Sequence, residues 1–215
     1  MIQLHHLVMS RSNRIAWLLE ELDLEYEVIR YERDPKTSAA PESLKAVHPL
    51  GKSPVITDGD LTIAESGAIV EYLIDTYDTQ ARLKPSGGQA LLDYRFWLHF
   101  AEGSMMPLLV MRLVLDKSLT SPMPFFIRPV IKKFIAALNR YFIEPRLTPQ
   151  LELVEDHLKQ SDWLAGDALS GADIQMVLAL VFAKTTTDFA PYPNINAYLH
   201  RVSLLDSYQA AEQRM

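Results

Sequence analysis

Two short segments of the chain carry residues suited to binding a small anion. Ser53 and Pro54 precede an apolar run that begins at Val55, and proline cannot donate a backbone hydrogen bond to a sheet. Pro54 therefore indicates an edge or a turn, with a cis bond as one option, and it leaves neighbouring backbone free for a ligand. Glu65 and Ser66 stand at the expected start of a helix, where Ser66 suits the N-cap position. Free N–H groups and the helix dipole favour an anion there.

Composition narrows the classes of partner. The chain has 215 residues, a formal charge of −6 and a hydrophobic content of 48%. This balance predicts an ordinary globular protein without nucleic acid or an anionic membrane as partner. The sequence has no basic, apolar leader and no apolar run near the roughly 20 residues that span a bilayer, so we expect a cytoplasmic location.

The absence of cysteine restricts the chemistry. It excludes disulfides, thiolate metal sites and a cysteine nucleophile, so a thiol reaction would need a sulfur that the ligand brings. The adjacent His5 and His6 point to opposite faces of a strand and cannot chelate one metal ion together. We therefore predict structural roles for both histidines and no metal site.

Hydrophobic periodicity predicts the elements that position these residues. A β-α-β unit, a short helix or turn, and a β-β-α unit follow one another. Their ranges are 3–9, 14–22, 26–31, 41–47, 55–56, 61–63 and 69–77.

The pattern becomes helical after a segment of linker composition. Long helical runs are expected near 89–117 and 126–147, with prolines 122, 124, 129, 145 and 149 in the joints. Ser170 and Asp173 form a predicted capping box before a buried helix. We therefore predict a first domain over 1–79, a linker over 80–88 and an all-α domain over 89–215.

Four sequence blocks in this order resemble the cytosolic glutathione transferases. They are Ser10-Arg-Ser-Asn-Arg14 with Leu18–Leu22, His48–Pro54, Ala64–Tyr72 and Ser170–Ile174. The resemblance implies a thioredoxin-like βαβ-α-ββα domain followed by an all-helical domain. The residues within these blocks look most like those of a serine-dependent bacterial and fungal branch of the family.

The resemblance also implies an activity. Glutathione would be the co-substrate, without a metal, and the enzyme would activate it as a thiolate that is conjugated to a small apolar electrophile or reduces a peroxide. A homodimer is expected. The alternative is a non-catalytic binding or regulatory protein of the same fold. A disulfide oxidoreductase is excluded because the chain has no cysteine.

Each part of glutathione can be matched to a residue on this resemblance. The γ-glutamyl carboxylate would bind at Ser66, the ammonium at Glu65, and the cysteinyl backbone along Ser53, which Pro54 holds in place. Lys52 would meet the glycyl carboxylate. The simpler interpretations are that Ser66 is only an N-cap and that Lys52 is an exposed loop lysine.

Ser10 and Ser12 are the candidates for stabilising the thiolate. The turn before the first helix contains no tyrosine or cysteine, so a serine hydroxyl with the field of the helix N-terminus is the available device. Families with this turn place the active serine four residues before the arginine, which selects Ser10 relative to Arg14, with Ser12 second. Alternatively, Ser10 is only the N-cap. Arg14 would give structural or electrostatic support.

The electrophile is expected in the cleft between the domains. Met9 would form its floor, and Met105, Met106 and Leu109 would line its wall, because methionine adapts to varied apolar shapes. A methionine stripe is also typical of plain core. Glu102 is interpreted as an exposed helical acid, with contact to a partner's glutathione as the alternative.

Overall fold

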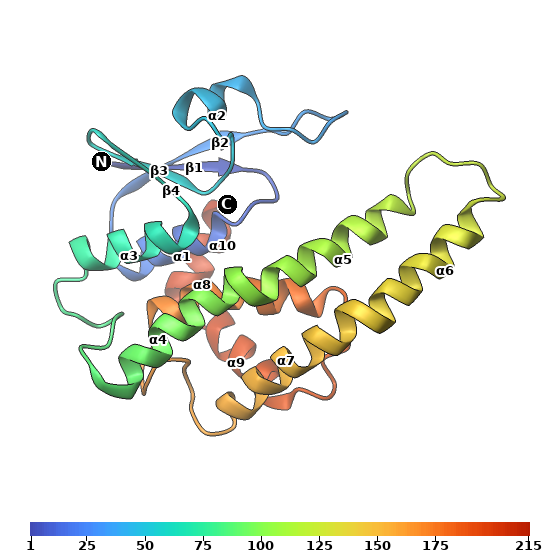
Figure 1. The fold of residues 1–215 in the computed structure, drawn as a ribbon. Helices are drawn as coiled ribbons and strands as arrows, with labels where there is room; N and C mark the ends of the chain where they lie inside the picture. The colour runs from blue at the N-terminus through green and yellow to red at the C-terminus, as the bar shows by residue number, and fades with distance from the viewer.

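The computed structural model describes residues 1–215 and places a small sheet beside a larger set of helices (Figure 1). The first part has the predicted order of elements. These are β1 (Ile2–Leu7), α1 (Asn13–Glu21), β2 (Tyr26–Tyr31), α2 (Glu42–Val47), β3 (Val55–Asp58), β4 (Leu61–Ala64) and α3 (Ser66–Tyr77).

The four strands form a mixed sheet in the order β2-β1-β3-β4. β1 is parallel to β2 and antiparallel to β3, and β4 completes the hairpin. Helices α1 and α3 cover the face toward the helical part, and α2 lies on the other side (Figure 1). The start of α1, the start of α3 and the turn before β3 are the segments that position the candidate site.

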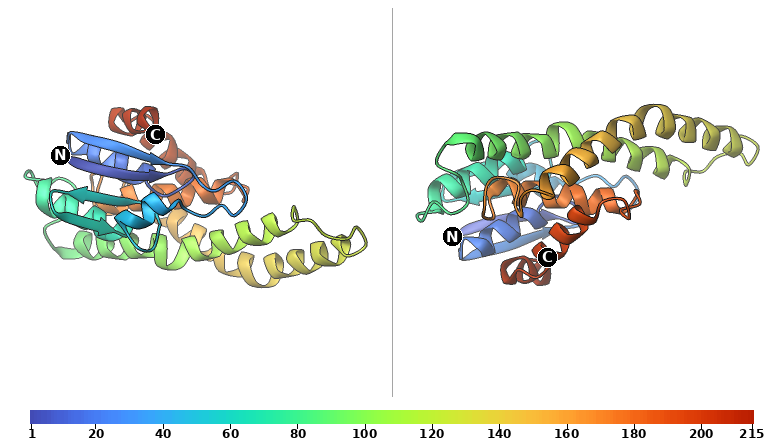
Figure 2. Two further views of the ribbon diagram at one scale, coloured as in Figure 1. Left: turned by 90° about the horizontal axis from the view of Figure 1, so that it is seen from above. Right: turned by 90° about the horizontal axis from the view of Figure 1, so that it is seen from below.

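The second part contains only helices. They are α4 (Gly88–Phe100), the π-helical η1 (Ala101–Met105), α5 (Met106–Ser118), α6 (Arg128–Leu138), the π-helical η2 (Asn139–Ile143), α7 (Glu144–Leu158), α8 (Gly171–Lys184), α9 (Pro193–Ser203) and α10 (Asp206–Arg214). α5 and α6 run side by side and project from the molecule as an arm (Figure 2).

The prediction that Pro145 and Pro149 lie in a joint is wrong. Pro145 stands in the first turn of α7 and Pro149 lies inside it. A proline ring clashes with the carbonyl four residues earlier in an α-helix. For Pro107 and Pro145 that carbonyl belongs to η1 and η2, where the wider π-helical turn moves it aside. The helical run therefore continues through both positions.

Helix α8 is the buried centre of the helical part, as predicted. Ten of its 14 residues are buried. The capping box is present, since Asp173 Oδ2 accepts hydrogen bonds from Ser170 N at 2.9 Å and Ser170 Oγ at 2.8 Å. The buried apolar residues of both parts join in one core of 43 residues. The positions of α1 and α3 are therefore fixed partly by the helical part.

The last helix returns to the first part of the chain. α10 packs against α1, and Trp17 Nε1 donates a hydrogen bond to Ser207 Oγ at 3.2 Å. Arg30 of β2 donates to the carbonyl oxygens of Arg214 and Met215 at 2.6 and 2.7 Å. The division into 1–79, 80–88 and 89–215 stays a prediction, although α3 ends at Tyr77 and α4 begins at Gly88.

One continuous helical run is long and apolar enough to cross a membrane, contrary to the expectation from the sequence. It covers Gly88–Ser118, which is 31 residues, and 44% of its most apolar window is buried inside the protein. Core helices pass the same test of length and composition, so this run is weak support for a membrane span.

Candidate functional site

In the turn before β3, the Ser53 side chain makes hydrogen bonds to β1 next to Pro54, which has no backbone N–H to donate. The Ser53–Pro54 bond is cis, and Pro54 has no N–H to offer β1. Ser53 Oγ instead donates to the His5 carbonyl oxygen at 2.7 Å and accepts from Leu7 N at 3.2 Å. The N–H and C=O of Ser53 itself have no partner within the chain. They are available to an extended peptide.

The turn after β1 separates the two candidate serines by exposure. Ser12 is fully buried, whereas Ser10 is half-buried and its Oγ donates to Ser53 Oγ at 3.0 Å. Ser12, and not Ser10, is the N-cap of α1, so the interpretation of Ser10 as a mere N-cap is wrong. No side chain caps α1. The field of its first turn is therefore unopposed beside the accessible hydroxyl of Ser10.

The start of α3 is an uncapped helix end with an unusual backbone. Glu65 is the N-cap residue and adopts φ 72°, and Ser66 is the first helical residue. The prediction that Ser66 is the N-cap is therefore wrong by one position, because the left-handed residue at 65 ends the non-helical segment. Ser66 Oγ is buried and accepts hydrogen bonds from Gln175 Nε2 at 3.0 Å and Arg14 Nη1 at 3.3 Å. Its own proton remains available for an anion.

A buried ion pair joins this helix start to the helical part. Arg14 Nη1 lies 2.6 Å from Glu102 Oε1, and the side chains are 1% and 30% exposed. Burial lowers the pKa of the Arg14 guanidinium and Glu102 raises it, so the group stays charged. Arg11 Nε lies 3.2 Å from the other carboxylate oxygen. Glu102 is thus an ion-paired residue within the chain and not a free helical acid.

Two exposed charged residues border the groups just described. Lys52 precedes Ser53 and Glu65 precedes Ser66, and neither side chain has an ion-pair or hydrogen-bond partner in the chain. An unpaired cation and an unpaired anion therefore border the candidate site. No group of three or more histidine, aspartate or glutamate side chains is placed to hold a metal ion.

The residues expected to bind an apolar acceptor do not share one surface. Met9 is 77% exposed, whereas Met105, Met106 and Leu109 are buried members of the core. Their burial follows from the packing of the η1 and α5 segment against α8. Only Met9 can touch a ligand without a rearrangement.

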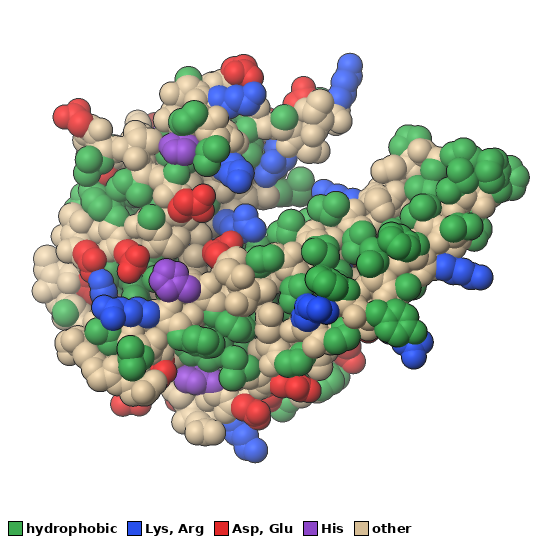
Figure 3. Space-filling model, in the orientation of Figure 1, with side chains coloured by type: hydrophobic (Ala, Val, Ile, Leu, Met, Phe, Trp, Pro, Cys, Tyr) green, Lys and Arg blue, Asp and Glu red, His purple; other side chains and the backbone are tan.

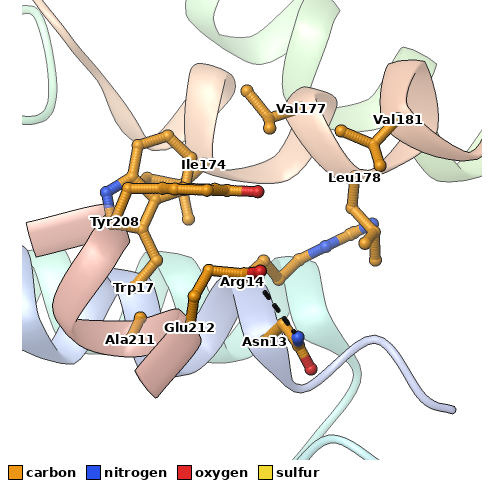
Figure 4. Close-up of a pocket in the computed structure, with 10 residues that line it drawn as sticks. All are labelled: Asn13, Arg14, Trp17, Ile174, Val177, Leu178, Val181, Tyr208, Ala211 and Glu212. Atoms are coloured by element: carbon orange, nitrogen blue, oxygen red, sulfur yellow. Dashed lines mark hydrogen bonds between the residues drawn. The ribbon is translucent and has the colours of Figure 1, made fainter. Parts of the chain in front are cut away.

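A cavity of about 230 Å³ opens instead between α1, α8 and α10 (Figure 4). Trp17, Val177, Leu178 and Tyr208 are among its apolar walls. Asn13 and Glu212 form a hydrogen bond across its edge at 3.5 Å. The cavity begins three residues after Ser10 in the sequence.

Three partnerships in the site could not be found by inspecting the sequence. They join His6 to Ser12, Gln175 to Ser66, and Glu102 to Arg14. The last two pairs are 109 and 88 residues apart along the chain, and no local pattern connects them.

Comparison with known proteins assigns both parts of the chain to one family. Residues 1–75 match the model "Glutathione S-transferase, N-terminal domain", and residues 144–206 match "Glutathione S-transferase, C-terminal domain". Glutathione S-transferase 3 of Schizosaccharomyces pombe is 34% identical, with 94% of this chain and 83% of that protein covered. Glutathione S-transferase 1 of Saccharomyces cerevisiae is 33% identical, with 99% and 94% covered.

The structural comparison agrees with the sequence comparison. The crystal structure of a glutathione S-transferase from Actinobacillus pleuropneumoniae superposes with a TM-score of 0.80 at 34% identity. The match covers 100% of this chain and 92% of the other. The thioredoxin-like sheet domain and the all-helical domain expected from the sequence are therefore confirmed.

Proposed function

The chain belongs to the glutathione S-transferase family, and we propose that it conjugates glutathione to small apolar electrophiles through a thiolate that Ser10 stabilises. Glutathione is the co-substrate of this family's transferase reaction. One observation carries the assignment to Ser10. Its hydroxyl is half-buried at the uncapped start of α1 and touches Ser53, while Ser12 is closed off from any ligand.

Glutathione would bind in an extended form along the site. Its γ-glutamyl carboxylate meets the start of α3 and the free proton of Ser66, and Glu65 binds its ammonium group. Its cysteinyl residue pairs with the free N–H and C=O of Ser53, next to the cis bond of Pro54. Lys52 binds the glycyl carboxylate. The side chains of Lys52 and Glu65 and the main chain of Ser53 have no partner within the chain, and Ser66 Oγ only accepts there, which supports this placement.

The reaction needs a thiol that ionises near neutral pH. Lowering its pKa by about two units requires roughly 3 kcal/mol of preferential stabilisation of the thiolate. A charge-assisted hydrogen bond from Ser10 and the field of α1 can together supply that amount. The thiol proton leaves to solvent, the sulfur forms a bond to the electrophilic carbon, and the leaving group departs with its electron pair. Attack of the same thiolate on a peroxide oxygen would break the O–O bond and release an alkoxide, which takes a proton from solvent. The glutathione sulfenic acid left behind would react with a second glutathione to give the disulfide and water, which is a peroxidase side activity.

The acceptor would approach the sulfur from the side of Met9. Met9 lies next to Ser10 in the sequence and is exposed, so it can contact an apolar molecule at the thiolate. The assignment of Met105, Met106 and Leu109 to the wall of the acceptor site stays a prediction, and all three side chains are buried in this structure.

Binding and ionisation of glutathione test this function directly. The thermal midpoint should rise with millimolar glutathione, and thiolate absorbance of the complex should show a thiol pKa well below that of free glutathione. Ser10→Ala should remove most of that pKa shift, whereas Ser43→Ala in α2 serves as a control on an exposed serine. Binding without a shifted pKa would favour the non-catalytic alternative, and no binding would refute the proposal.

A homodimer is part of the proposal. Exposed apolar side chains extend along α5 and α6 (Figure 3), among them Val114, Val130 and Phe134 at 60%, 65% and 58% exposure. Patches of this kind mark interaction surfaces. Phe134→Glu should shift the mass measured by light scattering toward the monomer, and Lys133→Glu on the same helix controls for charge. A monomeric mass for the wild type would contradict the proposed dimer.

The cytoplasmic location of the protein stays a prediction.

A further inference from the structure

A buried histidine is connected to Ser10 through a second hydroxyl. His6 lies on the central strand β1 and is 5% exposed. Its Nδ1 is 2.7 Å from Ser12 Oγ, and Ser12 Oγ is 2.8 Å from Ser10 Oγ. Three side chains therefore form one hydrogen-bonded chain from the core to the half-buried hydroxyl.

The number of protons fixes what this chain can do. Each serine hydroxyl has one proton. The Ser53 proton is donated to the His5 carbonyl oxygen, so Ser53 Oγ can only accept from Ser10. The remaining freedom lies in the direction of the bonds between His6, Ser12 and Ser10.

Two directions are possible, and the proton on Nδ1 selects between them. If Nδ1 carries a proton, it donates to Ser12, Ser12 donates to Ser10, and the Ser10 proton points out of the chain. If Nδ1 is bare, Ser12 donates to His6, and the Ser10 proton is drawn inward to Ser12. Only the first direction keeps both the His6–Ser12 and the Ser12–Ser10 hydrogen bonds and still leaves Ser10 a proton for a ligand sulfur.

We propose that His6 is a positioning residue for Ser10, whose Nδ1–H donates to Ser12 and thereby directs the Ser10 proton toward the sulfur of glutathione. This inference rests on the proposed function. In the free protein the outward proton is held by Ser53 Oγ, and the thiolate replaces that acceptor. No proton passes to His6, because the thiol proton leaves to solvent.

The surroundings favour a neutral imidazole, which can still donate from Nδ1–H when that nitrogen carries the proton. Burial lowers the pKa of His6, Arg30 on the paired strand β2 lowers it further, and Glu32 opposes them. Arg33 donates to the carbonyl oxygens of Val8 and Met9 in the same turn and adds another positive charge nearby. A neutral imidazole contributes no charge of its own to the thiolate, so its effect must pass through the hydrogen bonds.

The test is the pKa of the thiol in the glutathione complex, measured by thiolate absorbance. Ser12→Ala and His6→Ala should each raise it by about half a unit to one unit, and the double variant should raise it no further. His6→Asn should keep the thiol pKa close to its wild-type value, because the asparagine amide can place an N–H near the position of Nδ1. Affinity for glutathione should stay within about two-fold, so that the loss appears in kcat.

His5→Asn is the matched control. His5 is also 5% exposed on β1 and its pKa is also lowered by burial, but its ring contacts Tyr31 and Thr57 instead of the serines. The His5→Asn substitution should leave the thiol pKa of bound glutathione unchanged. A rise equal to that of His6→Ala would show general loosening of the sheet and would overturn the inference.

A second measurement uses the wild type and does not depend on whether the variants fold. Nitrogen NMR of the labelled complex should show the His6 proton on Nδ1, and a proton on Nε2 alone would overturn the inference. Ser10→Ala separates the two levels of the argument. If that variant leaves the thiol pKa unchanged, the proposed function fails; if it raises the pKa and His6→Ala does not, only the positioning role fails.

Discussion

Removing the charge of Glu102 should destabilise the protein far more than removing the charge of a comparable surface carboxylate. Glu102 Oε1 lies 2.6 Å from Arg14 Nη1, and the Arg14 side chain is 1% exposed. Nε and Nη2 of Arg14 are buried without partners. The substitution Glu102→Gln therefore leaves a cation in the interior with only neutral acceptors.

The size of the effect follows from burial. Opposite unit charges about 4 Å apart interact by about 4 kcal/mol at an effective dielectric constant of 20. Glu102 is 30% exposed, so water recovers part of this loss, and the glutamine oxygen can still accept from Arg14. We expect a loss of about 2 to 3 kcal/mol, below the 3 to 5 kcal/mol for breaking a fully buried pair.

The assay is denaturant unfolding, read as a shift of the midpoint at constant slope. Asp162→Asn is the matched control, because Asp162 Oδ1 lies 2.5 Å from Arg201 Nη2 but its side chain is 73% exposed. It should cost less than about 1 kcal/mol. Equal losses for the two substitutions, or no loss for Glu102→Gln, would show that burial of Arg14 does not determine the energy and would refute the reasoning.

Three further predictions concern packing, pH and ligand affinity. Gly171→Ala should lower the free energy of unfolding by about 1 to 3 kcal/mol, because the new Cβ would lie 2.5 Å from a side-chain carbon of α3. Gly103→Ala is the control, since that position has open space around it, and it should change the free energy of unfolding by less than about 1 kcal/mol. Burial lowers the pKa of His5 and His6 from 6.5 in the folded state, so the unfolded chain takes up protons first. Stability should therefore be full above pH 6.5 and fall below it, by at most about 1.4 kcal/mol per pH unit for each histidine, and asparagine at either position should reduce this slope in unfolding curves from pH 7.5 to 5. Lys52→Ala should weaken glutathione binding about five-fold in low-salt titration calorimetry, and a difference that persists at high salt would contradict an exposed ionic contact.

The sequence predicted the segments that position the site because their signals are local. Pro54 lacks a donor, and Ser170 with Asp173 form a cap within four residues. Each of these patterns fixes backbone conformation through neighbours in the chain. The order of strands and helices in the first domain follows from them.

The roles of the two serines could not be decided from the sequence. Ser10 and Ser12 have the same chemistry and lie two residues apart, and they differ in burial, which depends on the packing of α1 against the rest of the protein. The same limit applies to Met105 and Met106. A methionine stripe is compatible with a cleft or with a core, and only the tertiary structure distinguishes the two.

The one-residue error at Ser66 has a different cause. Serine is a strong N-cap residue, so the sequence favoured that position. In the structure Glu65 takes the cap position with a left-handed backbone, which is uncommon for a residue with a side chain. Such conformations cluster at ligand sites.

The return of α10 to α1 determines how chimeras of this protein must be built. Exchanging the helical domain by a single junction within residues 80–88 would also replace α10, so Trp17 and Arg30 would meet a foreign helix instead of their partners. A second junction before Asp206 would keep the native helix with the native sheet. The N-terminal sheet domain and α10 lie at opposite ends of the sequence, but they pack together and should be exchanged as one module.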